Sequence, residues 1–289
     1  MSDAEVTPPT VERLLKILDV ERLDRDLFRA PDLETKYPKG MRLFGGQVAG
    51  QALRAATLTV DVDHHPHSLH GYFLRPGSPD LPLILQVDRI RDGRSFTTRR
   101  VVAVQDGEAI FSLSCSFQKD EDGGEYAPSM PEGIPDPDDP DAGWDTTMFT
   151  EFNKRSPLEM LELPMTERDE RGHLSSTRRA WVRTRGALPD DQALQACVAA
   201  FVSDMGAVFA AARSVDMRPG TMMGASLDHA MWFHRPLRLD EWTLYDLGPV
   251  SAGGARGLVH GAMYDRAGTL AVSVAQEALI RPTKPRENP

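Results

Sequence analysis

One carboxylate stands in an almost wholly apolar stretch of the chain. Residues 196–210 read ACVAAFVSDMGAVFA, and Asp204 is the single charge among them. In a helix, the residues three and four positions away share its face. These neighbours are Ala200, Phe201, Ala207 and Val208. Burying an unpaired carboxylate costs several kcal/mol, so Asp204 needs hydrogen-bond donors or a catalytic task. The alternative is a structural carboxylate that caps the amides of a neighbouring strand.

A primary amide interrupts an apolar stripe near the C-terminus. Alternation along a strand places one set of side chains on a single face: Leu270, Val272, Val274, Gln276, Ala278 and Ile280. The buried amide of Gln276 would need partners for its donors and its carbonyl, which a fixed water and a substrate carbonyl could supply. A purely structural amide is the alternative.

Two further groups of residues could take part in binding or catalysis. Gly45 and Gly46, at the expected start of a helix, could present amides to a carbonyl or phosphate, or could serve close packing alone. Asp228 and His229 look like an acid-base pair, but adjacent strand residues point to opposite faces, so we interpret both as structural. His67 and His70 are interpreted in the same way, as residues that flank a strand.

The elements around these residues follow from the spacing of apolar residues and turn signals. A short N-terminal helix is expected after Pro9 and Thr10, and a buried helix from the two glycines through Ala56. Four strands should follow, divided by Pro-Gly and Asp-Gly pairs, at residues 70–74, 83–90, 95–104 and 109–118.

The same order of elements returns after an acidic, proline-rich segment. We expect a strand at 178–184, a helix at about 191–213, and strands at 225–234, 242–247, 255–264 and 269–281. The segment 72–76 matches 232–236 at an offset of 160, and Gly93 and Gly107 match Gly254 and Gly268 at 161. This spacing predicts a duplicated α+β unit whose two copies pair as a pseudo-dimer.

The repeat also marks Gln276 as unusual. At an offset of 161 it aligns with Cys115, while Val272 and Val274 align with Phe111 and Leu113. The first half therefore has a small apolar residue where the second has an amide. This pattern is typical of a duplication in which one active site has survived.

Composition limits the classes of function. The chain has 289 residues, 40% hydrophobic and 26% charged, which is typical of a folded globular protein. Its net charge of −10 predicts no nucleic-acid partner. Arg94, Arg99 and Arg100 are interpreted as a solvated strand face, although such a cluster could also attract phosphates.

The sequence has no pattern typical of a membrane segment, a secretory signal or a cysteine-rich metal site. We expect no membrane segment, because no run of eighteen apolar residues occurs, and no secretory signal at residues 1–30. Cys115 and Cys197 are too few for a disulfide framework or a zinc site and are expected in the core. A cytoplasmic protein without metal or cofactor is the prediction.

Five stretches together, in order and over nearly the full length, resemble the acyl-CoA thioesterase II family. They are LFGGQVAGQAL (43–53), HSLHGYFLRPG (67–77), DHAMWFHRP (228–236), ARG (255–257) and VAQE (274–277). The resemblance implies a tandem (double) hotdog fold, each half a central helix wrapped by an antiparallel sheet. The expected division is an N-terminal half at 1–118, a linker at 119–150 and a C-terminal half at 151–289.

The resemblance also implies a catalytic set and a substrate. The family's aspartate falls on Asp204, its hydroxyl residue on Ser226 and its glutamine on Gln276, which together orient a water. Ser226 replaces the threonine common in the family, keeping the oxygen and losing a methyl group. The implied reaction is hydrolysis of medium- to long-chain fatty acyl-CoA, with no cofactor, in a homodimer or homotetramer.

Two alternatives stay open at this stage. A non-catalytic acyl-CoA binding protein would be expected to carry a degenerate catalytic set, whereas Asp204, Ser226 and Gln276 are all present. A hotdog-type enoyl-CoA hydratase would be signalled by an aspartate followed five residues later by a histidine, and we find no such pair in a suitable loop.

Overall fold

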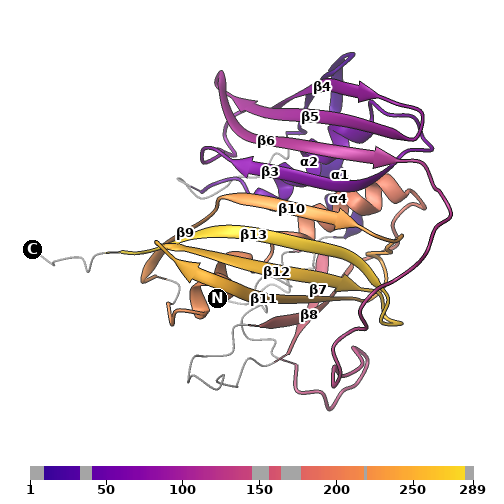
Figure 1. Cartoon of the computed structure of the whole chain (residues 1–289). Helices are drawn as coiled ribbons and strands as arrows, with labels where there is room; N and C mark the ends of the chain where they lie inside the picture. The colour runs from indigo at the N-terminus through magenta and orange to yellow at the C-terminus, as the bar shows by residue number, and fades with distance from the viewer. Residues whose placement is uncertain (1–9, 33–40, 145–155, 164–176, 218–219, 284–289) are drawn as a thin grey trace, which may run out of the picture.

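The computed structural model describes residues 10–32, 41–144, 156–163, 177–217 and 220–283. Within these ranges, thirteen strands form one continuous sheet, with helices on one side of it (Figure 1). The strand order is β1-β2-β4-β5-β6-β3-β10-β13-β12-β11-β8-β7, and β9 pairs with β13. The α+β, tandem hotdog fold expected from the sequence is confirmed.

The first half contains the helices α1 (Val11–Leu18) and α2 (Gly45–Thr57). Its strands are β1 (Glu21–Asp24), β2 (Leu27–Arg29), β3 (His65–Phe73), β4 (Ile84–Asp92), β5 (Phe96–Gln105) and β6 (Glu108–Gln118). The expected helices and four strands are confirmed. The sequence analysis missed β1 and β2 because they are short and β1 is fully exposed, so neither shows an apolar alternation.

The second half contains the helices α4 (Gln192–Ser203) and α5 (Ala207–Arg213). Its strands are β7 (Leu158–Glu162), β8 (Arg178–Thr184), β9 (Met222–Ser226), β10 (Asp228–Phe233), β11 (Thr243–Gly253), β12 (Arg256–Tyr264) and β13 (Leu270–Pro282). The sequence analysis missed β7 and expected one strand where β9 and β10 are separated at Leu227. Between the halves, the described residues 119–144 form neither helix nor strand.

The two halves join through β3 and β10, which pair antiparallel with His70 opposite Ala230. These two residues are 160 positions apart, which is the offset of the repeat. The two halves therefore join through corresponding strands. Beneath the sheet α2 and α4 lie side by side (Figure 1). Gly50 permits this approach, since an added Cβ would lie 2.9 Å from the Cys197 carbonyl oxygen. The repeat therefore forms a pseudo-dimer with one shared core.

The helix expected at 191–213 is broken directly after Asp204. Gly206 adopts a φ of +91°, a left-handed conformation that favours glycine, and α5 begins at the next residue. Two buried side chains hold the end of α4: Tyr245 Oη donates to the Ser203 carbonyl at 2.6 Å, and Arg178 Nη1 donates to the Met205 carbonyl at 2.8 Å. The apolar spacing continues through the break, so periodicity could not reveal it.

Residues Gln192–Arg213 meet the length and hydropathy of a membrane-crossing helix, but 78% of the apolar window is buried inside the protein. The mean hydropathy of the segment is high enough for a membrane-crossing helix, although polar residues interrupt its apolar run. Cys115 and Cys197 are free and fully buried, so their expected place in the core is confirmed.

The buried pair Arg178–Glu162 (Nε to Oε1, 2.8 Å) ties β8 to β7 beside this helix break. Replacing Glu162 by Gln should lower the free energy of unfolding by about 3 kcal/mol, because it removes a buried carboxylate that bonds Arg178 Nε. Urea denaturation measures the change. The matched control is Glu21→Gln in the exposed pair with Arg29, which should change stability by less than about 1 kcal/mol. Equal effects of the two substitutions would contradict the prediction.

Candidate active site

Asp204 lies at the C-terminal cap of α4, with a side chain that is 9% exposed. Its carboxylate accepts three hydrogen bonds. Ser226 Oγ donates to Oδ1 at 2.9 Å, Gln276 Nε2 donates to Oδ1 at 2.8 Å, and the Gly46 amide donates to Oδ2 at 2.9 Å. These donors offset the loss of hydration that burial imposes on the charge.

Ser226 and Gln276 complete a compact triangle with Asp204. Gln276 Nε2 lies 2.7 Å from Ser226 Oγ, while both atoms bond the same carboxylate oxygen. Ser226 ends β9 and Gln276 lies in the middle of β13, and the two strands pair with Ser226 opposite Ala278. The three residues singled out from the sequence are thus within direct hydrogen-bond reach of one another.

Gly45 and Gly46 form the first turn of α2 and approach Asp204 from the other half of the chain. An added Cβ at Gly45 would lie 2.6 Å from Asp204 Oδ2, so a side chain there would displace the carboxylate. At Gly46 the same atom would collide with the Phe201 carbonyl. Gly46 thus has a partner that the sequence analysis did not identify, and contact of either glycine with substrate stays a prediction.

Behind the triangle lies a chain of buried polar contacts that the sequence analysis did not anticipate. Gln276 Oε1 lies 2.6 Å from His229 Nδ1, and His229 Nε2 lies 2.7 Å from Ser203 Oγ. Burial lowers the pKa of the His229 imidazole, although the nearby charge of Asp204 acts in the opposite direction. Burial therefore favours the neutral form of the imidazole.

Asp228 points away from the polar contacts of Gln276, His229 and Ser203, as the alternation of strand side chains predicted. Its Oδ1 accepts the Glu277 amide at 2.6 Å, where β9 gives way to β10. Asp228 is therefore a structural cap, and the two residues do not converge on one point.

A cavity of about 350 Å³ opens beside the triangle, with Gly45 and Ser226 in its wall. Its other lining residues are mainly apolar, with two arginines: Arg42, Leu43, Val48, Phe73, Leu74, Arg75, Pro76, Gly77, Ile110, Phe111, Val208, Gly224, Ala225 and Leu227. They come from both halves of the chain. The cavity thus lies where the pseudo-dimer is formed, and Ser226 links it to Asp204.

The remaining sequence candidates lie elsewhere. His70 packs edge-on against Trp232 and His67 against Phe96, and neither contacts the triangle. The prediction that Arg94, Arg99 and Arg100 form a solvated face is wrong for Arg99. Arg99 is 1% exposed, because alternation along β5 turns it inward, where it bonds Thr59 and Asp92.

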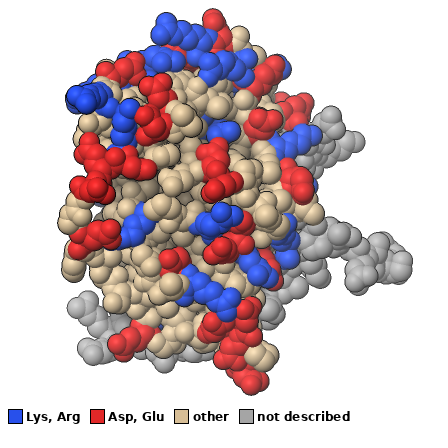
Figure 2. Space-filling model, turned by 90° about the vertical axis from the view of Figure 1, so that its right-hand side faces the viewer, with Lys and Arg blue, Asp and Glu red and all other residues tan. Residues whose placement is uncertain are grey.

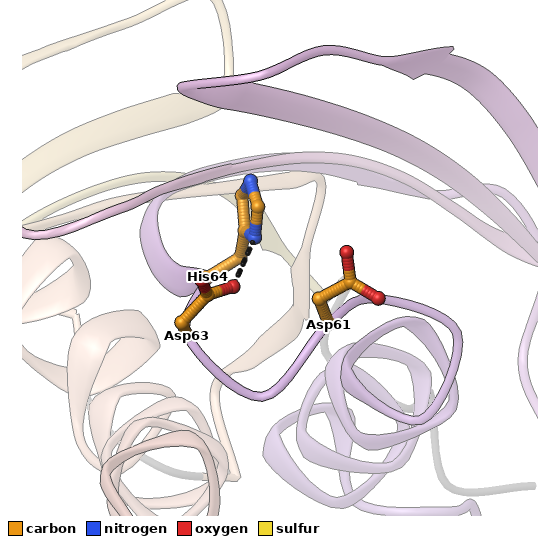
Figure 3. Close-up of side chains that lie close together, drawn as sticks. All are labelled: Asp61, Asp63 and His64. Atoms are coloured by element: carbon orange, nitrogen blue, oxygen red, sulfur yellow. Dashed lines mark hydrogen bonds and ion pairs between the residues drawn. The ribbon is translucent and has the colours of Figure 1, made fainter.

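Among the described residues, Asp61, Asp63 and His64 have the mutual spacing of metal ligands. Figure 3 shows them on a turn, with His64 Nδ1 directed at Asp63. Asp63 also bonds Lys119 Nζ at 2.6 Å, so this carboxylate already has a cationic partner. Figure 2 shows Lys and Arg side chains interspersed with Asp and Glu on one face of the molecule.

Comparison with known proteins places this geometry in a family. Residues 33–118 match the model of the acyl-CoA thioesterase N-terminal domain, and residues 151–279 match that of acyl-CoA thioesterase.

Relatives match the chain over nearly its whole length. It is 39% identical to acyl-coenzyme A thioesterase 8 of Mus musculus, covering 92% of this chain and 88% of that one. It is 32% identical to acyl-CoA thioesterase 2 of Haemophilus influenzae, covering 94% and 98%. The crystal structure of acyl-CoA thioesterase II TesB2 from Mycobacterium marinum superposes with a TM-score of 0.79 at 40% identity, covering 93% and 98%. The chain belongs to the acyl-CoA thioesterase II family.

Proposed function

We propose that this protein hydrolyses medium- to long-chain fatty acyl-CoA to free fatty acid and CoA, by attack of an oriented water on the thioester carbonyl. The observation that carries the proposal is the triangle of Asp204, Ser226 and Gln276, of which Ser226 lines an apolar cavity. These residues offer a carboxylate and a hydroxyl for a single water, and the Gln276 amide holds both of them.

Counting hydrogen bonds supports a place for the water on Asp204. A carboxylate offers about four acceptor positions on its two oxygens. Ser226 and Gln276 occupy Oδ1, whereas Oδ2 has one bond among the described residues, from Gly46. In the proposed mechanism the remaining position on Oδ2 accepts a proton of the water, so that Asp204 acts as general base or orienter.

The N-terminus of α2 supports stabilisation of the oxyanion. Backbone amides at a helix N-terminus are unpaired within the helix and carry partial positive charge. The Gly46 amide is taken by Asp204, while Gly45, the first residue of α2, lines the cavity. We assign the Gly45 amide to the developing negative charge on the thioester oxygen.

The cavity supports the choice of substrate. Its apolar lining suits an alkyl chain, since burial of methylene groups away from water is favourable. Arg42 and Arg75 also line it, and guanidinium groups bind phosphates well. We therefore propose that the acyl chain occupies the apolar wall and that the CoA phosphates lie near the two arginines.

The two rival functions predict different chemistry. A non-catalytic acyl-CoA binding protein needs no buried carboxylate beside the carbonyl site, and Asp204 would then cost stability without benefit. A hydratase would add water across a carbon-carbon double bond and release no thiol. Thiol release from decanoyl-CoA separates hydrolysis from both rivals.

Association and location follow the resemblance. We propose a homodimer or homotetramer, supported by exposed apolar side chains on the central strands, Tyr72 and Trp232 among them. Light scattering after size exclusion tests this.

A cytoplasmic location is also proposed, supported by two free cysteines.

Asp204→Asn should lower kcat by at least about a hundredfold, because the substitution removes the group that accepts the water proton. The measurement is release of CoA from decanoyl-CoA. Asp228→Asn is the matched control: its side-chain oxygen can still accept the Glu277 amide, so turnover should stay at the wild-type level. Undiminished thiol release by the folded Asp204→Asn protein would refute the catalytic assignment.

Acyl chain length should govern kcat/KM. Each buried methylene contributes about 0.8 kcal/mol, so kcat/KM should rise about fourfold per methylene until the cavity is filled. Leu43→Trp should move the plateau to shorter chains by filling the cavity wall, whereas Leu81→Trp, outside the cavity, should not. Rates measured from butyryl-CoA to palmitoyl-CoA provide the profile. Equal values for butyryl-CoA and decanoyl-CoA would argue against a fatty acyl substrate.

A further inference from the structure

Gln276, His229 and Ser203 form a continuous polar chain through an otherwise apolar core. Their side chains come from β13, β10 and the last turn of α4, and the three residues are at most 1% exposed. The contacts are 2.6 Å from Gln276 Oε1 to His229 Nδ1 and 2.7 Å from His229 Nε2 to Ser203 Oγ. Neither His229 nor Ser203 lines the cavity beside the triangle.

The other half of the same chain shows what packing alone requires at these positions. In the sheet, Leu69 is the counterpart of His229 at the offset of 160, and Cys115 that of Gln276 at 161. Leu69 and Cys115 lie opposite one another on β3 and β6. His229 and Gln276 continue the same register of β10 and β13.

The central helices give the counterpart of Ser203. Both helices begin at equivalent places, Gly45 and Gln192, which differ by 147, and they cross where Gly50 meets Cys197, also 147 apart. Ser203 therefore corresponds to Ala56.

The first half thus buries Ala56, Leu69 and Cys115 where the second half buries Ser203, His229 and Gln276. The apolar set packs equally well, with every member at most 2% exposed. The fold therefore does not need a polar residue at any of these places. The polar set occurs only in the half that carries the triangle.

We propose that His229 and Ser203 are positioning residues that hold the Gln276 amide with its NH₂ group toward Asp204 and Ser226. This inference rests on the proposed function of the triangle. A neutral imidazole carries one N–H. When Nδ1–H donates to Gln276 Oε1, Nε2 must accept, and the Ser203 hydroxyl, whose Oγ lies 2.7 Å from Nε2 and 3.0 Å from the Ala200 carbonyl oxygen, can donate to it. Because a hydroxyl can donate or accept, Ser203 holds the imidazole ring in place, and His229 selects the orientation of the amide.

The consequence for the site follows from the two ends of the amide. A rotated Gln276 would present its carbonyl oxygen to the Asp204 carboxylate and to the lone pairs of Ser226. Without the His229 donor, the buried Oε1 atom loses its partner, and the amide loses one of the three contacts that define its orientation. The hydroxyl and the carboxylate that hold the water would then be positioned less firmly.

A double-mutant cycle on kcat tests the proposal. His229→Leu places the first half's residue at this position and removes the donor, and His229→Asn keeps an N–H close to the Nδ1 position. His229→Leu should lower kcat by roughly ten- to a hundredfold, the range known for outer partners of metal ligands, and change KM by less than about threefold. His229→Asn should restore kcat to within about threefold of wild type. In a Gln276→Ala background His229→Leu should have no further effect, because its target is gone.

The control is His234→Leu, which breaks a second histidine-serine contact, from Nε2 to Ser273 Oγ at 2.8 Å, outside the triangle and its cavity. Its kcat should equal that of wild type. If circular dichroism shows that His229→Leu does not fold, Ser203→Ala, which introduces the first half's alanine, goes through the same cycle and decides the result.

The outcomes distinguish the positioning role of His229 and Ser203, called the relay below, from the proposed function of the triangle. Full activity of His229→Leu beside an inactive Gln276→Ala would overturn the relay alone. So would an equal loss from His229→Leu in both backgrounds, which is the result expected of a merely structural residue. Wild-type turnover by Gln276→Ala would overturn the catalytic set and the relay with it.

Discussion

A buried carboxylate must be solvated by the protein, and this requirement organises the centre of the molecule. The three donors to Asp204 come from three elements: the amide of Gly46 on α2, the hydroxyl of Ser226 on β9 and the amide of Gln276 on β13. A shift of any one of these elements would deprive the buried carboxylate of one of its donors. The absence of a Cβ at Gly45 serves the same geometry, because a Cβ there would lie 2.6 Å from Asp204 Oδ2.

Duplication explains why one such site exists in a chain with two similar halves. Pairing of β3 with β10 and of α2 with α4 buries the apolar faces of both halves in a common core. The same pairing brings the N-terminus of α2 to the end of α4, so the first half supplies an amide to the carboxylate of the second. At the offsets of 147, 160 and 161, the counterparts of Asp204, Ser226 and Gln276 in the first half are Thr57, Pro66 and Cys115. None of these has a charged or amide side chain. The first half thus completes the site without duplicating it.

The polar side chains of the site are held by further buried hydrogen bonds behind them. Gln276 satisfies Asp204 and Ser226 with its NH₂ group and His229 with its carbonyl, so both ends of the amide are bonded. Such a fully connected network is stiff, because each group that turned away would leave a buried partner unsatisfied. Preorganised groups of this kind lower the cost of orienting a water, which is the step that the proposed hydrolysis needs.

The sequence by itself determined the elements that rest on local patterns. The central helices, most strands and the duplication followed from periodicity, turn residues and a constant offset, and Asp204 and Gln276 stood out because their polarity conflicts with their surroundings. Ser226 was reached only through resemblance to the family, since a serine in a strand is locally unremarkable. The short strands β1, β2 and β7 lack enough residues for a pattern to register.

Tertiary structure alone decided which polar groups meet. The bond from Gly46 to Asp204 spans the two halves, and the contact of His229 with Gln276 depends on strand register, neither of which periodicity encodes. The break at Gly206 was hidden because the apolar spacing continues through it, whereas the inward face of Arg99 follows from alternation along β5 and was misinterpreted because arginine is rarely buried. Local spacing specifies which face a residue takes within its own element, whereas the partners on that face are set by the packing of elements far apart in the chain.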